Sequence, residues 1–220
     1  MSDETIPPEG SRGSPWPGCI ILITILVVFG GLAVLYLVVG TYQNRVIGKF
    51  TQTAPDELPI PVPNATEAEA AVAKLQSIAT AARDNRAERV LFTATELNTL
   101  IVTLPELADF RGTTRIEAIT ADGISAEMSQ PMRKGILAKG ARYLNATFVF
   151  QPELRVRTIA FKVISITPKE GTLPEGFVQN FATLDFFKLD PELPAIADSV
   201  HSIGAVYCEE GQLVVETKIQ

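Results

Sequence analysis

One segment of the chain is apolar throughout: residues 18–40 read GCIILITILVVFGGLAVLYLVVG and contain no charged side chain. A helix rises about 1.5 Å per residue, so roughly 20 apolar residues cross the hydrocarbon core of a bilayer. Trp16 precedes the segment, and Arg45 and Lys49 follow it, as is typical of residues at a membrane interface. The segment is too long, and the residues before it too acidic, for a cleaved signal peptide. The pattern predicts one transmembrane helix over 18–40, with the lipid bilayer as its partner.

This helix divides the chain into four parts. Residues 1–17 form a polar tail, 18–40 the transmembrane helix, 41–65 a juxtamembrane segment with a proline-rich linker, and 66–220 a domain. The linker has four prolines within residues 54–64. Such a segment is extended and semi-rigid at about 3.1 Å per residue, so it predicts a spacer that holds the domain up to roughly 30 Å from the membrane.

Two capping boxes predict helices at the start of the domain. Thr66 followed by Glu69 opens a predicted helix over 66–83, in which apolar residues recur at helical spacing. Thr93 followed by Glu96 opens a second helix, which Pro105 ends.

The middle and the end of the chain alternate between apolar and polar residues, which indicates strands. Asp122–Gly123 is a hairpin turn signal between two of them. A change of apolar parity between Val156 and Ile159 predicts a bulge or bend inside one long strand. Strands are predicted over residues 89–92, 113–120, 124–130, 143–151, 154–167, 202–208 and 213–219. The predicted fold class is therefore α+β, with one N-terminal transmembrane helix followed by a curved antiparallel β-sheet packed on helices.

Charge and composition narrow the function. The chain has 19 Lys and Arg against 25 Asp and Glu, a net charge of −6, which disfavours nucleic-acid binding because that needs a basic surface. His201 is the only histidine, and Cys19 and Cys208 lie far apart, so no metal site and no cofactor are predicted. The clustered acids Asp185, Asp190, Glu192 and Asp198 are interpreted as solvated loop residues. No catalytic residue is assigned, and the protein is predicted not to be an enzyme.

An aromatic segment carries the one hypothesis about a binding site. Helices are predicted over 175–183 and 191–198, and the segment contains the four residues Phe177, Phe181, Phe186 and Phe187. An apolar helix beside a sheet can line an elongated pocket, because ligand sites are concave and mostly apolar. These four residues are the candidate ligand-binding site for a lipid or other apolar molecule. The alternative is ordinary core packing of a helix on a sheet.

Three short strings resemble a known family. They are Phe92-Thr-Ala-Thr-Glu-Leu-Asn98, Tyr143-Leu-Asn145 and Leu173-Pro-Glu-Gly-Phe177. In their order they are similar to bacterial single-span envelope proteins with a TULIP-like (tubular lipid-binding-like) domain. The resemblance implies a curved antiparallel sheet wrapped on a helix, an extracytoplasmic location and lipid handling.

Two functions follow as hypotheses. The first is a membrane-anchored, non-enzymatic envelope protein that binds or transfers a lipid or other apolar ligand. The alternative is a scaffold or interaction module of a membrane protein complex, with an envelope protein as its partner. The charges flanking 18–40 favour a cytoplasmic domain by a margin of one. The resemblance favours a periplasmic domain on the cell membrane, and we adopt that orientation as the expectation.

Overall fold

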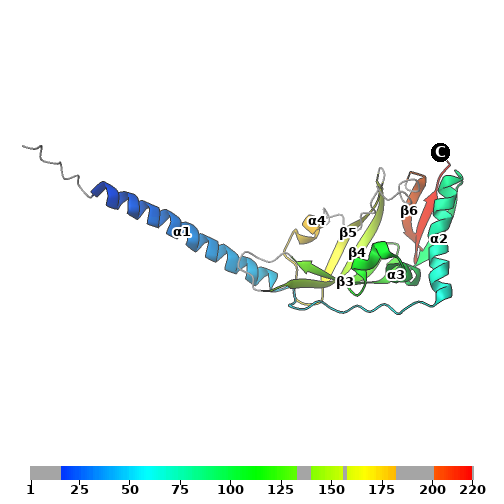
Figure 1. Cartoon of the computed structure of the whole chain (residues 1–220), viewed down its shortest axis with the longest axis horizontal. Coiled ribbons are helices and arrows are strands. Elements are labelled where there is room, and N and C mark those ends of the chain that lie inside the picture. Colours follow the sequence, from blue (N-terminus) through cyan, green and yellow to red (C-terminus); the bar gives the residue numbers. More distant parts are fainter. Residues whose placement is uncertain (1–15, 133–139, 156–157, 182–200, 220) are drawn as a thin grey trace, which may run out of the picture.

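The computed structural model describes residues 16–132, 140–155, 158–181 and 201–219. A long helix, α1 (Trp16–Ile47), extends away from a body of strands and shorter helices (Figure 1). The strands of the body form two antiparallel sheets, one of three strands and one of four. The predicted α+β class, with an apolar helix ahead of antiparallel strands and helices, is confirmed.

The length and composition of α1 would allow it to cross a bilayer. Its stretch Cys19–Ile47 is long and apolar enough, and the most apolar part has no residue buried inside the protein. The hydroxyl groups within it bond to the helix itself, since Thr24 Oγ1 donates to the carbonyl of Ile20 at 2.9 Å. The helix predicted at 18–40 is present and continues for two further turns, to Ile47.

Helix α2 (Ala65–Arg83) starts slightly earlier than predicted. Asn64 is its N-cap: the Asn64 side chain accepts from the Glu67 amide at 2.8 Å, and Glu67 Oε2 accepts from the Asn64 amide at 3.0 Å. The predicted box of Thr66 and Glu69 is therefore wrong by two residues. Asn64 and Glu67 have the same spacing, and asparagine is among the strongest N-cap residues, so they take the role.

The second predicted capping box is confirmed. Strand β1 (Arg89–Thr93) leads directly into helix α3 (Ala94–Thr103), and Thr93 and Glu96 cap each other at 2.9 and 3.2 Å. Partial burial alone would raise the pKa of Glu96, but hydrogen bonds from Lys74 and from the Thr93 backbone lower it below its ordinary value. A short 3₁₀ helix, η1 (Pro105–Phe110), follows α3.

The four-stranded sheet has the order β2–β3–β4–β5. Its hairpin at Asp122–Gly123 is confirmed, because Thr120 pairs with Gly123 where β2 meets β3. Gly123 has φ +145° and faces the backbone of Phe150, so only glycine fits this turn without strain. The strands are β2 (Thr114–Thr120), β3 (Gly123–Met132), β4 (Arg142–Arg155) and β5 (Thr158–Pro168).

The long strand predicted over 154–167 is wrong. Strand β4 runs through Pro152 to Arg155, and Arg155 pairs antiparallel with Thr158, the first residue of β5. The change of parity thus marks a reversal of the chain, not a bulge. Pro152 fits inside β4 because the pairing of β4 with β3 ends at Phe150, which leaves one edge of β4 without a partner strand there.

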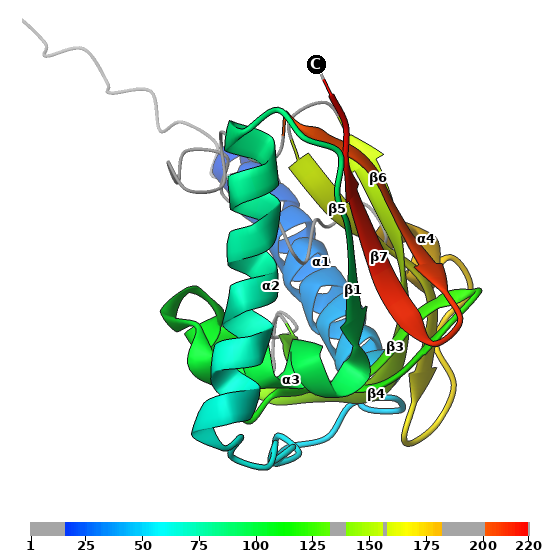
Figure 2. The same cartoon turned by 90° about the vertical axis from the view of Figure 1, so that its right-hand side faces the viewer.

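The three-stranded sheet has the order β1–β7–β6 and contains the predicted C-terminal hairpin. Glu210 and Gly211 both have positive φ, 48° and 81°, as a two-residue type I′ turn requires. Figure 2 shows these three strands side by side, with α2 running alongside β1. The hairpin strands are β6 (Ile203–Glu209) and β7 (Gln212–Thr217).

A single hydrophobic core joins the two sheets and the helices. Its members include residues of β1, of all four strands of the larger sheet, and of β6 and β7. Its most deeply buried large side chains come from β3, β4 and β5 and are almost fully excluded from solvent: Phe148, Phe150, Met128, Leu144 and Val163. The described part of the interior is thus packed with side chains.

Candidate functional site

The end of α1 is joined closely to the body. Thr51 Oγ1 donates to the carbonyl of Ile47 at 2.6 Å, which satisfies one of the last carbonyls of the helix. Phe50 is only 4% exposed and belongs to the hydrophobic core. The chain therefore passes from the last residue of α1 into the core of the body within three residues.

Two glycines allow this close approach. A side chain at Gly171, which has φ +71°, would collide with the backbone carbonyl of Lys49. A side chain at Gly48 would collide with the guanidinium of Arg142, at the start of β4. The exit of α1 is thus held between the first residue of β4 and the loop that follows β5.

Phe177 also lies at the junction between α1 and the body. It is the first residue of the short helix α4 (Phe177–Phe181), and its ring meets the ring of Phe50 edge to face, with centroids 5.2 Å apart. Of the other predicted ligand-binding residues, Phe181 ends α4 but its side chain is not described. Phe186 and Phe187 lie outside the described residues, as does the helix predicted over 191–198. The structure therefore places one of the four in a contact that the sequence did not reveal.

The linker after α1 lies against the four-stranded sheet. We call residues 52–58 the strap; Figure 1 shows the chain from α1 running along the base of the body to α2. At one end, the backbones of Gln52 and Tyr143 exchange hydrogen bonds of 2.8 and 2.9 Å. At the other end, the Leu58 amide donates to the carbonyl of Gly112 at 3.0 Å, and the Leu58 side chain is buried.

The predicted spacer between α1 and the domain is therefore wrong for residues 52–58, which are bonded to the sheet. Prolines do keep the segment extended, but the backbones of Gln52, Ala54, Asp56 and Leu58 also find partners on the body. The height of the body above the apolar part of α1 is set by the helix itself. Thr41–Ile47 adds roughly 10 Å at 1.5 Å per residue, in place of a spacer of up to roughly 30 Å.

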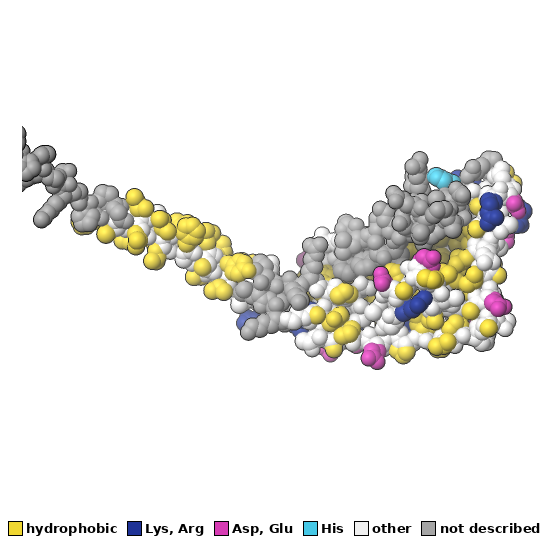
Figure 3. Space-filling model, viewed as in Figure 1, with side chains coloured by type: hydrophobic (Ala, Val, Ile, Leu, Met, Phe, Trp, Pro, Cys, Tyr) yellow, Lys and Arg dark blue, Asp and Glu magenta, His cyan; other side chains and the backbone are white. Residues whose placement is uncertain are grey.

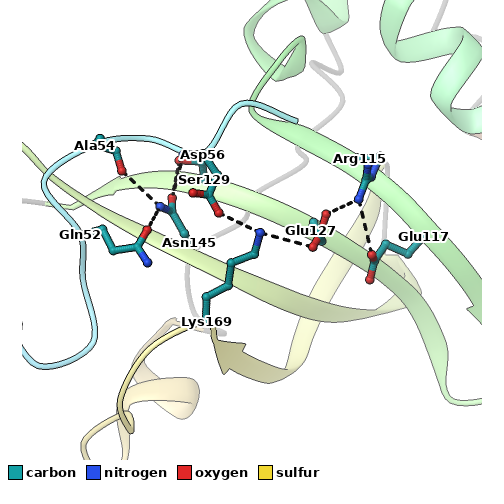
Figure 4. A network of polar contacts seen from close by, with 9 residues as sticks. All are labelled: Gln52, Ala54, Asp56, Arg115, Glu117, Glu127, Ser129, Asn145 and Lys169. Atoms are coloured by element: carbon teal, nitrogen blue, oxygen red, sulfur yellow. Dashed lines mark hydrogen bonds and ion pairs between the residues drawn. The ribbon is translucent and has the colours of Figure 1, made fainter. Parts of the chain in front are cut away.

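Asn145 is the centre of the strap's attachment (Figure 4). Its Oδ1 accepts from Ser129 Oγ at 2.6 Å and from the Asp56 amide at 3.3 Å. Its Nδ2 donates to the Ala54 carbonyl at 3.2 Å and to Gln52 Oε1. An amide side chain has two donor hydrogens and two acceptor lone pairs, so all four positions are in use. Asn145 is 3% exposed, so it reads as a structural residue of the junction.

An ion-pair network continues from the strap across the sheet (Figure 4). Lys169 Nζ lies 2.8 Å from Asp56 Oδ2 and 3.5 Å from Glu127 Oε1, and Glu127 Oε2 lies 2.5 Å from the guanidinium of Arg115. The hydrogen bond to Asp56 raises the pKa of Lys169 above its ordinary value, against a smaller opposing effect of desolvation. The positive charge of Lys169 thus helps to hold the strap on the sheet.

The described residues offer little for catalysis. His201 is exposed in the turn before β6, and the acids at 185, 190, 192 and 198 lie outside the described residues. Within the described ranges, no three His, Cys, Asp or Glu side chains are grouped to hold a metal ion. Burial raises the pKa of the Cys208 thiol, which keeps it protonated and slow to react.

Comparison with known proteins adds no relative. No protein-family model matches the chain, and no curated protein or solved structure matches it. The resemblance to TULIP-like envelope proteins therefore rests on the short strings of this sequence alone. The candidate functional site is therefore the junction between α1 and the body, with its strap and polar network.

Proposed function

We propose that the protein is a membrane-anchored, non-enzymatic interaction module whose body is held at a fixed height on the bilayer surface. The single observation that carries this is the docked strap, fastened by Asn145 and Lys169. A protein that docks onto a membrane complex benefits from a fixed position and orientation. A carrier that moves a ligand over a distance needs a loose tether, and residues 52–58 are not loose.

The proposed location is the cell membrane, with α1 inserted and the body extracytoplasmic. The length and composition of α1 support insertion. The orientation rests on the resemblance to envelope proteins, against a flanking charge difference of one. The proposed partner is a protein of the same membrane.

Substitutions at position 62 test both the partner and the orientation. Val62 is 87% exposed and follows the strap. With a photocrosslinking residue at this position, ultraviolet light in living cells is expected to give one discrete adduct with a membrane protein. The same residue placed at Arg83, at the other end of α2, is the control for random collision and should give no discrete adduct. The exposed Ile164 of β5 is a second position for the photocrosslinking residue. If neither Val62 nor Ile164 gives a discrete adduct, the proposed interaction module is contradicted.

The orientation is read from Val62→Cys. A membrane-impermeant maleimide applied to spheroplasts is expected to label it. The unsubstituted protein is the background control, because its Cys208 is half-buried with a raised pKa and its Cys19 lies in α1. Labelling only after the cells are lysed would place the body in the cytoplasm and overturn the extracytoplasmic assignment.

A second candidate function is the binding of a lipid or other apolar ligand. The observation that favours it is the place of α4: Phe177 is half-buried next to the exit of α1, at the end of the body that faces the proposed membrane. Mass spectrometry of lipids extracted from the full chain is expected to find one lipid species enriched about tenfold over the surrounding membrane. Phe177→Asp should remove the enrichment. A lipid profile equal to that of the membrane would contradict this candidate.

A further inference from the structure

We propose that the exit of α1 is a binding site for the phosphate of an anionic lipid headgroup, formed by Arg45, Lys49 and Arg142. This rests on the proposed insertion of α1 into a bilayer. Figure 3 shows hydrophobic side chains along α1 and basic side chains where α1 meets the body.

The three cations lie at the correct height. The apolar run ends at Gly40, so Arg45 and Lys49 stand roughly 8 and 14 Å further along the helical path at 1.5 Å per residue. The headgroup layer of one leaflet is about 5–8 Å thick. Both side chains are exposed and long enough to reach back to this layer, as arginine and lysine do at interfaces. Tyr42, which is 69% exposed, lies at the level where interfacial aromatic residues are common.

The third cation comes from the body. Arg142 is the first residue of β4, and its guanidinium lies over Gly48, where the absence of a side chain leaves room for it. The backbone bridge between Gln52 and Tyr143 fixes the start of β4 against the strap. Arg142, which is 97 positions from Arg45 and 93 from Lys49 in the chain, thus brings a third positive charge to the exit of α1.

The three cations take no part in the ion pairs of the described part of the protein. Several other cations of the body are paired, as Lys74 is with Glu96 and Lys169 with Asp56. Among the described residues, none forms an ion pair with Arg45, Lys49 or Arg142. The nearest loop carries the exposed acids Glu170 and Glu175, and neither forms an ion pair with the three cations.

Phosphate is the group that this arrangement fits. The whole chain has a net charge of −6, so three unpaired cations at its membrane end are the exception to its acidic character. Arginine binds phosphate with two parallel hydrogen bonds, and lysine contributes a mobile point charge. Each Lys or Arg near an anionic membrane surface strengthens binding by about 1 kcal/mol, which is about fivefold in affinity. The membrane that α1 enters supplies such phosphates at high density.

Electron paramagnetic resonance of spin-labelled lipids tests the proposal on the full chain. The protein is reconstituted in phosphatidylcholine vesicles with a trace of spin-labelled phosphatidylglycerol or phosphatidylcholine. The motionally restricted fraction gives the relative affinity of the two lipids. We expect phosphatidylglycerol to be preferred about fivefold, the factor for one cation. The combined substitutions Arg45→Gln, Lys49→Gln and Arg142→Gln should reduce the preference to about one.

The matched control removes the same charge elsewhere. Arg83→Gln, Lys162→Gln and Lys218→Gln affect exposed cations. Arg83 ends α2, which lies at the end of the body away from α1 (Figure 1), Lys218 follows β7, and Lys162 lies in β5. This variant should keep the preference for phosphatidylglycerol. Equal affinity of the two lipids for the unsubstituted protein, or an equal loss in both variants, would overturn the site. If neither lipid is restricted, α1 is not inserted, and the proposed membrane anchoring fails with it.

Discussion

Gly171→Ala is expected to lower the free energy of unfolding of the body by about 3 kcal/mol. Two costs add up. An alanine at φ +71° is strained by roughly 1–2 kcal/mol, and its Cβ meets the backbone carbonyl of Lys49, which cannot move without shifting the exit of α1. The melting temperature should fall by about 6–12 °C, since 1 kcal/mol corresponds to about 2–4 °C in a chain of this size.

Gly112→Ala is the matched control for this substitution. Gly112 has φ +73°, almost the same backbone conformation, but a Cβ there would meet nothing within 4 Å. It should therefore show the strain alone, about 1–2 kcal/mol. Equal destabilisation by the two substitutions would contradict the tight contact between the loop after β5 and the exit of α1. Gly48→Ala adds a graded case, because the group it meets is the flexible end of Arg142.

Asn145→Ala is expected to destabilise the body by about 3 kcal/mol and to loosen the strap. The substitution removes four hydrogen bonds from a side chain that is 3% exposed. It leaves the Ser129 hydroxyl, the Asp56 amide and the Ala54 carbonyl without this partner. Unsatisfied groups at a buried site cost more than the net value of the hydrogen bonds that are lost.

Two measurements follow this substitution. Urea unfolding gives the change in stability, and limited proteolysis with a glutamate-specific protease reports the strap, because Glu57 is exposed and precedes the buried Leu58. Cleavage after Glu57 should become faster in Asn145→Ala. Thr147→Ala, two residues along the same strand, is the control and should change stability by less than about 0.5 kcal/mol. Unchanged cleavage after Glu57 would mean that Asn145 does not hold the strap.

The sequence predicts the parts of the fold whose conformation depends on residues close together in the chain. The Thr93–Glu96 capping box joins residues three positions apart, and the Asp122–Gly123 turn requires only two adjacent residues. The uniform apolar run of α1 is a similar local signal. The α+β class follows from such elements, because capped helices and alternating strands are both visible along the chain.

The junction could not be predicted, because its partners are distant in sequence. Asn145 bonds to strap residues 89 to 93 positions away, and the Phe50–Phe177 contact spans a still greater separation. The composition of residues 54–64 is the same for a free spacer and for a docked strap. The alternation of β4 places Asn145 on the face opposite Leu144 and Ala146, where a polar residue is expected in solvent, so nothing in the sequence indicates that Asn145 is buried.

The docked strap also has a consequence for the order of biogenesis. The strap is synthesised immediately after α1, but Ser129, Asn145 and Lys169, which hold it, are made about 70 to 120 residues later. During translation the strap therefore lacks these partners at first, and it has all of them only when Lys169, just after β5, has been made. The same residues 52–58 therefore connect α1 to the growing chain without these contacts at first, and fix α1 to the body once the protein has folded.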